Sequence, residues 1–289
     1  MPNLARYQRG FGRRKPGPSY RLDYSNPLTR NLRSCWLFNE GGGLLSRDLI
    51  LSRTGTNIGG VIWKAGDFFC GPTLYLNGSS GYVSFGTGPS ILGTSNFTVS
   101  FWMKTSAVTS SHIYGQREAG ATGYEGEIIV GVNATGTVFL VVYNDLSGGP
   151  GHQWGAAITT PLAYNDNKWH HIVATRSNGP GYIYVDGLLA ASASAASNVS
   201  LLSLNCYYGA NVRDSTEFFA GFLDNLLIYQ RDLSAQEIWQ LYQEPFAFIK
   251  QAAPKRTIFG PTQAPATPAS FNAAWVYQNT NVIVGGGTY

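Results

Sequence analysis

The sequence predicts an all-β protein, an antiparallel β-sandwich with one short helix near its C-terminal end and an extended arm at each terminus. From residue 34 to residue 229, short runs rich in Val, Ile, Tyr, Phe and Trp alternate with Gly, Asn, Ser and Asp, as in strands joined by turns. Only one stretch has a helical pattern, and the two ends have no regular pattern. The predicted parts are an arm over 1–31, a body over 32–248 and a tail over 249–289.

The composition agrees with a folded body and a polar, largely neutral surface. Of the 289 residues, 44% are hydrophobic and 12% are charged, against about 25% charged in a typical soluble domain. Such surfaces suit close packing into assemblies, although they also occur in monomeric β proteins. The net charge of +4 is concentrated at the start of the chain, where the first 33 residues hold eight Arg and Lys and one acid.

Residues 1–31 are predicted to form an extended basic arm. The stretch RGFGRRKPGPSYR cannot bury enough apolar surface to fold by itself. Because arginine binds carboxylates in a bidentate geometry, we expect the arm to anchor the protein to neighbouring subunits, in preference to nucleic acid. A solvated terminus is the simpler alternative. The predicted anchoring residues are Arg6, Arg9, Arg13, Arg14, Lys15 and Arg21.

Alternation of apolar and polar residues predicts the strands of the body. In NFTVSFWMKT the odd-numbered positions from Phe97 to Met103 are apolar, so one face belongs to the core and the other is partly covered. EIIVGVN and TVFLVVYND are expected to pair as a hairpin around residues 133–136, because Asn and Gly there tolerate the positive φ of a tight turn.

Two adjacent histidines and an acidic turn raise the question of a catalytic site. His170 and His171 follow one another on a predicted strand, so their side chains point to opposite faces and cannot share a metal ion. In YIYVDGLLA, Asp186 and Gly187 form the pair typical of a two-residue type I′ turn. We therefore interpret the histidines and Asp186 as framework residues.

The helix is predicted in DLSAQEIWQLYQEP. Ser234 as N-cap with Glu237 three residues later is a capping box, an apolar stripe follows, and Pro245 ends the helix. Beyond residue 248, Pro and Ala interrupt every pattern until a final apolar run, VYQNTNVIVGGGTY. We expect that run to be a single strand that adds to a sheet edge, in this subunit or another.

Three features of the sequence bear on where the protein folds. The basic start is not followed by an apolar run of signal-peptide length, and no segment approaches the roughly 18 apolar residues of a membrane span. Cys35, Cys70 and Cys206 are odd in number and lack CxxC spacing, which disfavours a disulfide framework and a zinc site. We expect buried or inert thiols in a protein that folds in a reducing cytoplasm.

Seven segments, in order, resemble the laminin-G-like, concanavalin A-like jelly-roll family: CWLFNEGGG, TGTNIGGVIWKAG, PTLYLNGSSGYVSF, NFTVSFWMKT, NKWHHIVAT, YIYVDGLL and FAGFLDNLLIYQRDLSAQEIWQLY. The resemblance covers about residues 32–242. It implies a jelly-roll of two antiparallel sheets stacked face to face, with loops gathered at one rim. The family includes carbohydrate binders, adhesion modules, viral surface domains and glycoside hydrolases, so the fold does not settle the function.

Sugar binding requires exposed aromatic rings flanked by hydrogen-bonding groups. Each such residue alone is more often a packing residue than a ligand contact. The candidates in or beside predicted loops are Tyr124, Tyr143, His152, Trp154, Tyr207 and Tyr208.

Calcium is the one cofactor candidate, because the resembled family often holds this ion at its loop rim and Asp and Asn supply suitable oxygen ligands. Ordinary turn residues are the simpler interpretation. The candidate ligands are Asp67, Asn144, Asp145 and Asp214. Asp224 matches a position of the family that we interpret as structural.

Glu125 and Glu127 are the best pair of carboxylates for glycoside hydrolysis, because they would share a strand face. They lack the interposed acidic residue of the concanavalin A-like glucanase pattern. None of the four histidines lies beside a GxSxG motif, the signature of a nucleophilic serine. We therefore expect no enzymatic activity and assign no catalytic residue.

These observations predict a structural or decoration protein of a bacteriophage virion, folded in the host cytoplasm. The body would be displayed on the particle, and the arms would bind other virion proteins or further copies of the chain. Scarce charge, free cysteines and two non-globular ends agree with this function. The first alternative is a carbohydrate-binding, lectin-like adhesion module, and the second is a glycoside hydrolase.

Overall fold

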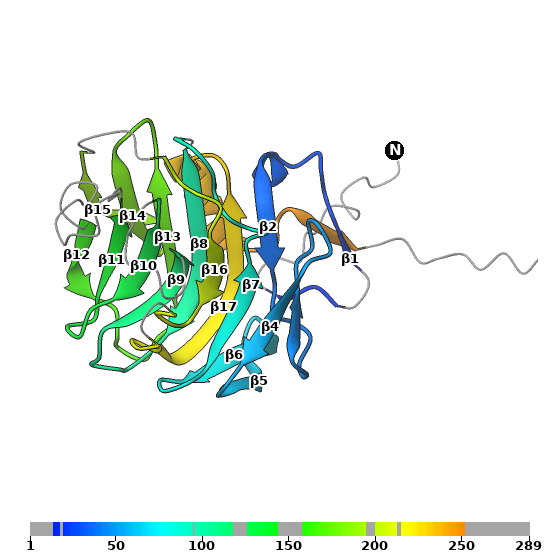
Figure 1. Cartoon of the computed structure of the whole chain (residues 1–289). Coiled ribbons are helices and arrows are strands. Elements are labelled where there is room, and N and C mark those ends of the chain that lie inside the picture. Colours follow the sequence, from blue (N-terminus) through cyan, green and yellow to red (C-terminus); the bar gives the residue numbers. More distant parts are fainter. Residues whose placement is uncertain are drawn as a thin grey trace, which may run out of the picture. The chain divides into compact units, whose positions relative to one another are not determined.

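Two antiparallel β-sheets stack face to face and form a sandwich with one helix, as predicted (Figure 1). The computed structural model describes residues 14–17, 20–94, 96–117, 126–143, 158–194, 200–212 and 215–251, without the side chains of residues 66–68 and 251. Within the described residues, no helix has the length and apolarity of a membrane-spanning segment.

The first sheet, called here the β9 sheet, has the strand order β12-β11-β10-β9-β16-β7-β4-β3. Its strands are β3 (Leu45–Arg47), β4 (Thr54–Ile58), β7 (Tyr82–Gly86), β9 (Ser111–Arg117), β10 (Ile128–Val132), β11 (Thr137–Val142), β12 (Ile158–Ala163) and β16 (Asn205–Tyr208). β10 and β11 form the hairpin predicted from the sequence, and Gly136 in its turn has a φ of 83°.

The second sheet, called the β17 sheet, has the order β15-β14-β13-β8-β17-β6-β5, and β2 also pairs with β17. Its strands are β2 (Leu32–Trp36), β5 (Val61–Phe68), β6 (Gly71–Asn77), β8 (Phe97–Lys104), β13 (His170–Arg176), β14 (Gly181–Val185), β15 (Leu188–Ala193) and β17 (Ala220–Tyr229). One edge of β17 is divided, because β6 pairs with residues 220–223 and β2 with residues 226–229. The edge forks at a bulge that follows Asp224.

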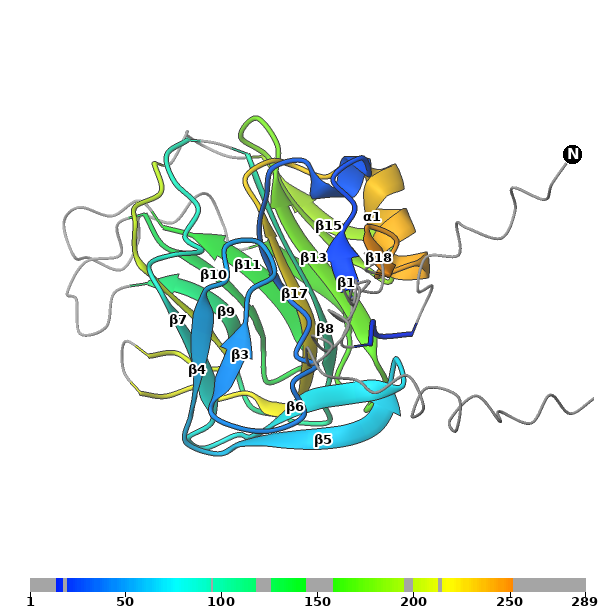
Figure 2. The same ribbon diagram turned by 90° about the vertical axis from the view of Figure 1, so that its right-hand side faces the viewer.

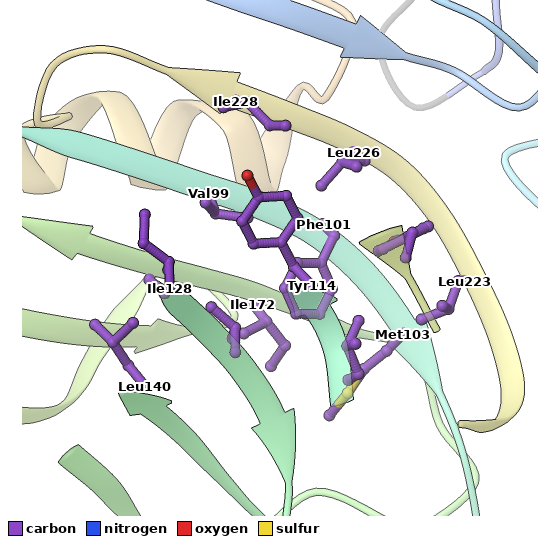
Figure 3. Packing of buried hydrophobic residues seen from close by; sticks show 14 of the residues in the cluster. Val99, Phe101, Met103, Tyr114, Ile128, Leu140, Ile172, Leu223, Leu226 and Ile228 are labelled. Atoms are coloured by element: carbon purple, nitrogen blue, oxygen red, sulfur yellow. The ribbon is translucent and has the colours of Figure 1, made fainter. Parts of the chain in front are cut away.

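The inner faces of both sheets form the main core (Figure 3). The alternation predicted for β8 is confirmed, since Val99, Phe101 and Met103 are fully buried between the sheets. Their partners from the β9 sheet include Tyr114 and Ile128. Both faces of β8 are covered, because residues on its outer face, such as Trp102, are also buried.

α1 (Ala235–Gln243) lies on the outer side of the β17 sheet (Figure 2). The predicted capping box is present, because the Ser234 side chain accepts from the backbone of Glu237 and the Glu237 side chain accepts from the backbone of Ser234. Ile238 and Leu241 are buried in a second apolar cluster with Trp102. The helix is therefore held by tertiary packing, as a helix of this length requires.

The folded body extends into the predicted arm and tail. β1 (Tyr20–Leu22) pairs with β18 (Ile249–Gln251), and a short 3-10 helix, η2, spans Pro27–Thr29. Leu22, Leu28 and Ile249 enter the second apolar cluster. The boundaries predicted near residues 31 and 249 therefore do not match the edges of the body, because strands of three residues are too short for alternation to reveal. Residues 1–13 and the predicted terminal strand lie outside the described residues.

The turn between β14 and β15 has the predicted type I′ conformation, with φ of 52° at Asp186 and 82° at Gly187. A Cβ at Gly187 would lie 2.7 Å from the Trp239 ring, so this position needs glycine for space as well as for its backbone conformation.

The three cysteines are free thiols. Cys35 and Cys206 are buried, and burial raises the pKa of Cys206 to about 12. Cys70 is exposed, because it lies in the turn between β5 and β6, so the expectation of a buried or inert thiol stays a prediction there.

Candidate functional site

The candidate site lies on the outer face of the β9 sheet. Cross-strand register connects outward-facing residues of six strands, from β11 to β4, in the order Val141, Ile129, Gly115, Tyr207, Ser84 and Thr56. Gly115 has no side chain at the centre of this row, and a Cβ there would lie 3.4 Å from Cγ of Arg117. The Arg117 side chain therefore lies against the backbone at Gly115.

A polar cluster surrounds Arg117. Its Nε lies 3.3 Å from Oε2 of Glu127, and its Nη1 donates to Oδ1 of Asn211 at 2.9 Å. Nδ2 of Asn211 donates to Oε2 of Glu217 at 2.8 Å. With His112, these residues form what we call the Glu217 cluster, in which side chains from β9, the residue before β10 and the segment before β17 meet.

His112 connects Arg117 to Glu217. Its Nδ1 lies 3.3 Å from Nη1 of Arg117, and its Nε2 lies 3.2 Å from Oε2 of Glu217. Burial and the charge of Arg117 lower the pKa of His112 to about 3, so the ring is neutral at pH 7. The tautomer that satisfies both contacts has Nδ1 as acceptor and Nε2–H as donor.

Glu217 presents its carboxylate at the surface of the cluster. Its side chain is 38% exposed, and its backbone has a φ of 51°, in the left-handed region that side chains other than glycine rarely adopt. The backbone N–H of His112 donates to the Glu217 carbonyl at 3.0 Å. The contacts with Asn211 and His112 hold the carboxylate in one orientation, so it is preorganised.

Aromatic rings lie beside the cluster on the same sheet face. The ring centroid of Tyr82 lies 6.1 Å from that of Tyr207 and 6.4 Å from that of Phe218. Tyr82 and Phe218 are half-buried, Tyr207 is buried with 8% of its surface exposed, and Phe218 follows Glu217 in the chain. We call these three residues the Tyr82 platform. Half-buried rings next to oriented polar groups are the combination that binds sugars.

The predicted ligand residues have different positions. Tyr207 belongs to the platform, and Tyr143 is half-buried at the end of β11, where its N–H donates to the Glu127 carbonyl at 3.0 Å. Tyr208 is wrong as a ligand contact, because strand alternation turns it into the core, where it stacks on Phe38 at 5.5 Å. The other three candidates, Tyr124, His152 and Trp154, lie outside the described residues.

Sequence reasoning missed most of the site, namely His112, Arg117, Asn211, Glu217, Tyr82 and Phe218. The register of β9 and β10 shifts between Val130 and Gly131, so simple alternation does not reveal which side of SHIYGQR faces outward. The polar and charged residues of that strand were the one sequence signal that could have pointed to His112 and Arg117.

The calcium and hydrolase predictions remain untested. Asn144, Asp145 and Asp214 lie outside the described residues, and the side chain of Asp67 on β5 is not described. The described residues hold no group of three His, Cys, Asp or Glu that could bind a metal ion. Glu127 is buried beside Arg117, and Glu125 lies outside the described residues.

Lys15 does not fit the predicted role of a subunit anchor. Its side chain is 2% exposed, and its Nζ lies 2.6 Å from Oδ1 of the fully buried Asp224. The same Nζ donates to the carbonyls of Phe38, at 2.9 Å, and Pro72. The Lys15 side chain therefore lies in the fork between β6 and β2, inside the same subunit. The buried contact with Lys15 also confirms that Asp224 has a structural role.

The structure describes two of the remaining anchor candidates. Arg14 and Arg21 are exposed, and their role stays a prediction. Arg6, Arg9 and Arg13 lie outside the described residues.

The adjacent histidines are framework residues with opposite orientations, as predicted. Nε2 of the buried His171 lies 2.8 Å from Oγ of Ser100, and its ring stacks on Trp102 at 4.9 Å. Nδ1 of His170 lies 2.8 Å from Asp186, and Nε2 lies 3.0 Å from Asp166. Asp186 also accepts from the backbone N–H of His171 at 2.9 Å.

The His170 contacts predict a pH dependence of stability. Burial opposes the charge on His170, but the two carboxylates outweigh it and raise its pKa. A raised pKa in the folded state stabilises the protein fully below the unfolded value of about 6.5, and this contribution is lost as pH rises through the folded value. We expect His170→Gln to lower the unfolding free energy more at about pH 5.5 than at about pH 9. Urea denaturation at both pH values measures this, and equal losses would contradict it.

Comparisons with known proteins agree with this fold. Residues 77–239, more than half of the chain, match the Laminin_G_3 family model, described as the concanavalin A-like lectin/glucanases superfamily. Comparison with curated protein sequences gave no significant match.

Solved structures show the same fold at low identity. Domain 4 of AbnA, an extracellular arabinanase from Geobacillus stearothermophilus in complex with arabinotriose, is 19% identical, with a TM-score of 0.55 over 74% of this chain and 98% of that domain. The binding domain of Paraclostridial Mosquitocidal Protein 1 is 18% identical, with a TM-score of 0.57 over 74% of this chain and 52% of that one.

The binding domain of botulinum neurotoxin DC in complex with SialylT is 14% identical, with a TM-score of 0.54 over 74% of this chain and 52% of that one. The chain thus spans about half the length of these two binding domains. Because the family model matches more than half of the chain and the fold is a two-sheet sandwich, this chain belongs to the concanavalin A-like lectin/glucanase superfamily.

Proposed function

We propose that the protein is a non-catalytic carbohydrate-binding module whose ligand contacts the Glu217 cluster and the Tyr82 platform. The observation that carries the proposal is a preorganised surface carboxylate beside half-buried aromatic rings on one sheet face. In this arrangement the rings pack against the apolar face of a sugar, and Glu217 accepts hydrogen bonds from its hydroxyl groups.

The comparisons support this function over the virion role predicted from the sequence. One similar structure is in complex with arabinotriose and another with SialylT. Neither the fold nor the comparisons support the decoration of a phage particle, which stays a prediction, as does the virion location.

The expectation that the protein is not an enzyme also remains a proposal. It is supported by Glu127, the one described member of the candidate catalytic pair, which lies 3.3 Å from the Arg117 guanidinium in a buried ion pair. Such a carboxylate is held as an acceptor by Arg117, whereas a general acid must donate a proton.

A binding experiment tests the module. An array of arabino-oligosaccharides, sialylated glycans and other oligosaccharides would identify a ligand, and titration calorimetry would measure its Kd. Hydrogen bonds to a charged group contribute about 1.5–3 kcal/mol, so we expect Glu217→Ala to weaken binding by about 10- to 100-fold. Tyr82→Ala should weaken it as well, through the lost ring contact.

Tyr24→Ala is the matched control, because Tyr24 is 76% exposed and lies outside both the cluster and the platform. Its affinity should equal that of the wild type. The proposal fails if no oligosaccharide binds, or if Glu217→Ala and Tyr82→Ala bind the identified ligand as tightly as the control variant does.

A further inference from the structure

The contact between Lys15 and Asp224 holds an amine and a carboxyl group together in the interior. Lys15 precedes β1, and Asp224 lies within β17. Nζ and Oδ1 are 2.6 Å apart, and the two side chains are 2% and 0% exposed. Bulk water therefore does not separate the two groups, and holding two reactants in contact can give an effective concentration of about 10⁵ M or more.

Hydrogen bonds direct Nζ of Lys15 toward the carboxyl group. The carbonyl oxygens of Phe38, at 2.9 Å, and Pro72 accept from Nζ. When a neutral amine donates both of its hydrogens to these carbonyls, its lone pair occupies the remaining position, which faces Asp224. Burial lowers the pKa of Lys15, and burial raises the pKa of Asp224 to about 7. Both shifts favour the neutral amine and the neutral acid, which are the forms that react with each other.

The two carboxyl oxygens of Asp224 differ in their surroundings. Oδ1 accepts from the backbone N–H of Asn225 at 2.8 Å, a donor that would stabilise negative charge on this oxygen when an amine adds to Cγ. Oδ2 is buried and has no hydrogen-bond partner. An unpaired buried oxygen destabilises the folded state, and loss of Oδ2 as water would remove that cost.

Glu40 is a third carboxylate whose charge acts on the pair. It raises the pKa values of both Lys15 and Asp224. Its Oε1 accepts from the backbone N–H of Arg47 at 2.8 Å, whereas its Oε2 is buried without a hydrogen-bond partner. Oε2 is therefore available to carry a proton. A cavity of about 560 Å³ beside Lys15 leaves room for a released water molecule.

We propose that Lys15 and Asp224 condense to form an amide bond inside the chain. Nζ attacks Cγ, a proton from Nζ passes through Glu40 to Oδ2, the Cγ–Oδ2 bond breaks, and one water molecule leaves. Nothing is oxidised or reduced, so the step needs no co-reactant. The ion pair is the reactant, and the neutral amide no longer carries the cost of two buried charges.

The amide bond would join the N-terminal segment covalently to β17, in the interior of the β17 sheet. The bond lies away from the Glu217 cluster and the Tyr82 platform, because its residues belong to neither. The proposal goes beyond glycan binding and does not depend on it.

Mass spectrometry of the purified full chain tests the bond. We expect an intact mass lower than the sequence mass by one water molecule. A tryptic digest should contain residues 15–21 joined to residues 214–231, and fragmentation should place the junction at Lys15 and Asp224. This measurement involves no substitution, so it decides the question even if a variant fails to fold.

Three variants identify the groups that take part. Lys15→Arg keeps a positive charge, but guanidinium stays protonated and is no nucleophile, so this chain should have the full sequence mass. In Glu40→Gln we expect linking to be at least about 100-fold slower, the contribution of a proton carrier, in a protein that still unfolds cooperatively in urea. Lys168→Gln is the matched control, because Lys168 is 77% exposed, and it should link as the wild type does.

Samples taken over time during cell-free synthesis give the rate of linking. A wild-type chain with the full sequence mass would overturn the proposal. A loss of water without the joined peptide, or one that persists in Lys15→Arg, would come from another dehydration and would overturn it as well. Equal rates in Glu40→Gln and the wild type would show that Glu40 does not carry the proton.

Discussion

Lys15→Met is expected to lower the free energy of unfolding by about 3–5 kcal/mol, the cost of removing one partner from a buried ion pair. Lys15 and Asp224 are 2% and 0% exposed, and Nζ and Oδ1 are 2.6 Å apart. Burial raises the pKa of Asp224 to about 7, and Lys15 opposes that rise. Without the ammonium group, Asp224 is left at the fork of β17 without a cation.

Urea denaturation of three variants tests this role. Lys15→Met should be strongly destabilised, the double variant Lys15→Met with Asp224→Leu should recover much of the loss, and Arg14→Met should match the wild type because Arg14 is exposed. A Lys15→Met protein within about 0.5 kcal/mol of the wild type would show that Lys15 does not fasten the N-terminal segment to the sheet.

Tyr208→Ala should also lower the unfolding free energy by about 3–5 kcal/mol, the typical cost of removing a buried aromatic ring. Tyr208 is 0% exposed, and its ring centroid lies 5.5 Å from that of Phe38 and 6.0 Å from that of Phe101. Tyr208→Phe should have a small effect, because the hydroxyl makes only a 3.4 Å contact with the Asp224 carbonyl.

Thermal or urea unfolding measures both Tyr208 variants, and glycan titration under folding conditions should detect no loss of affinity in Tyr208→Phe. A loss below about 1.5 kcal/mol in Tyr208→Ala, or a loss of glycan affinity in Tyr208→Phe, would contradict the register that places Tyr207 outward and Tyr208 inward.

Local signals in the sequence were sufficient to predict the strands, the helix and the turn that form the body of the fold. Alternation over eight residues defined the core face of β8, the Ser234–Glu237 pair located the start of α1, and Asp186–Gly187 located a type I′ turn. Each of these signals depends on neighbours in the chain, so it can be interpreted without the tertiary structure.

The candidate site could not be predicted in the same way. β16 has four residues, too few for alternation to tell Tyr207 from Tyr208. His112, Asn211 and Glu217 come together only through sheet pairing and the left-handed backbone at Glu217. Lys15 looked like part of a free basic arm because its partner, Asp224, is distant in sequence.

Amide hydrogen exchange with and without the oligosaccharide identified on the array tests most directly the claim that the outer face of the β9 sheet binds glycan. We predict slower exchange in β7, β9, β16 and residues 215–219 when that ligand is bound, and little change in α1 and β14. Protection confined to α1 and β14, or absent from β9 and β16, would contradict the assignment of the site to the Glu217 cluster and the Tyr82 platform.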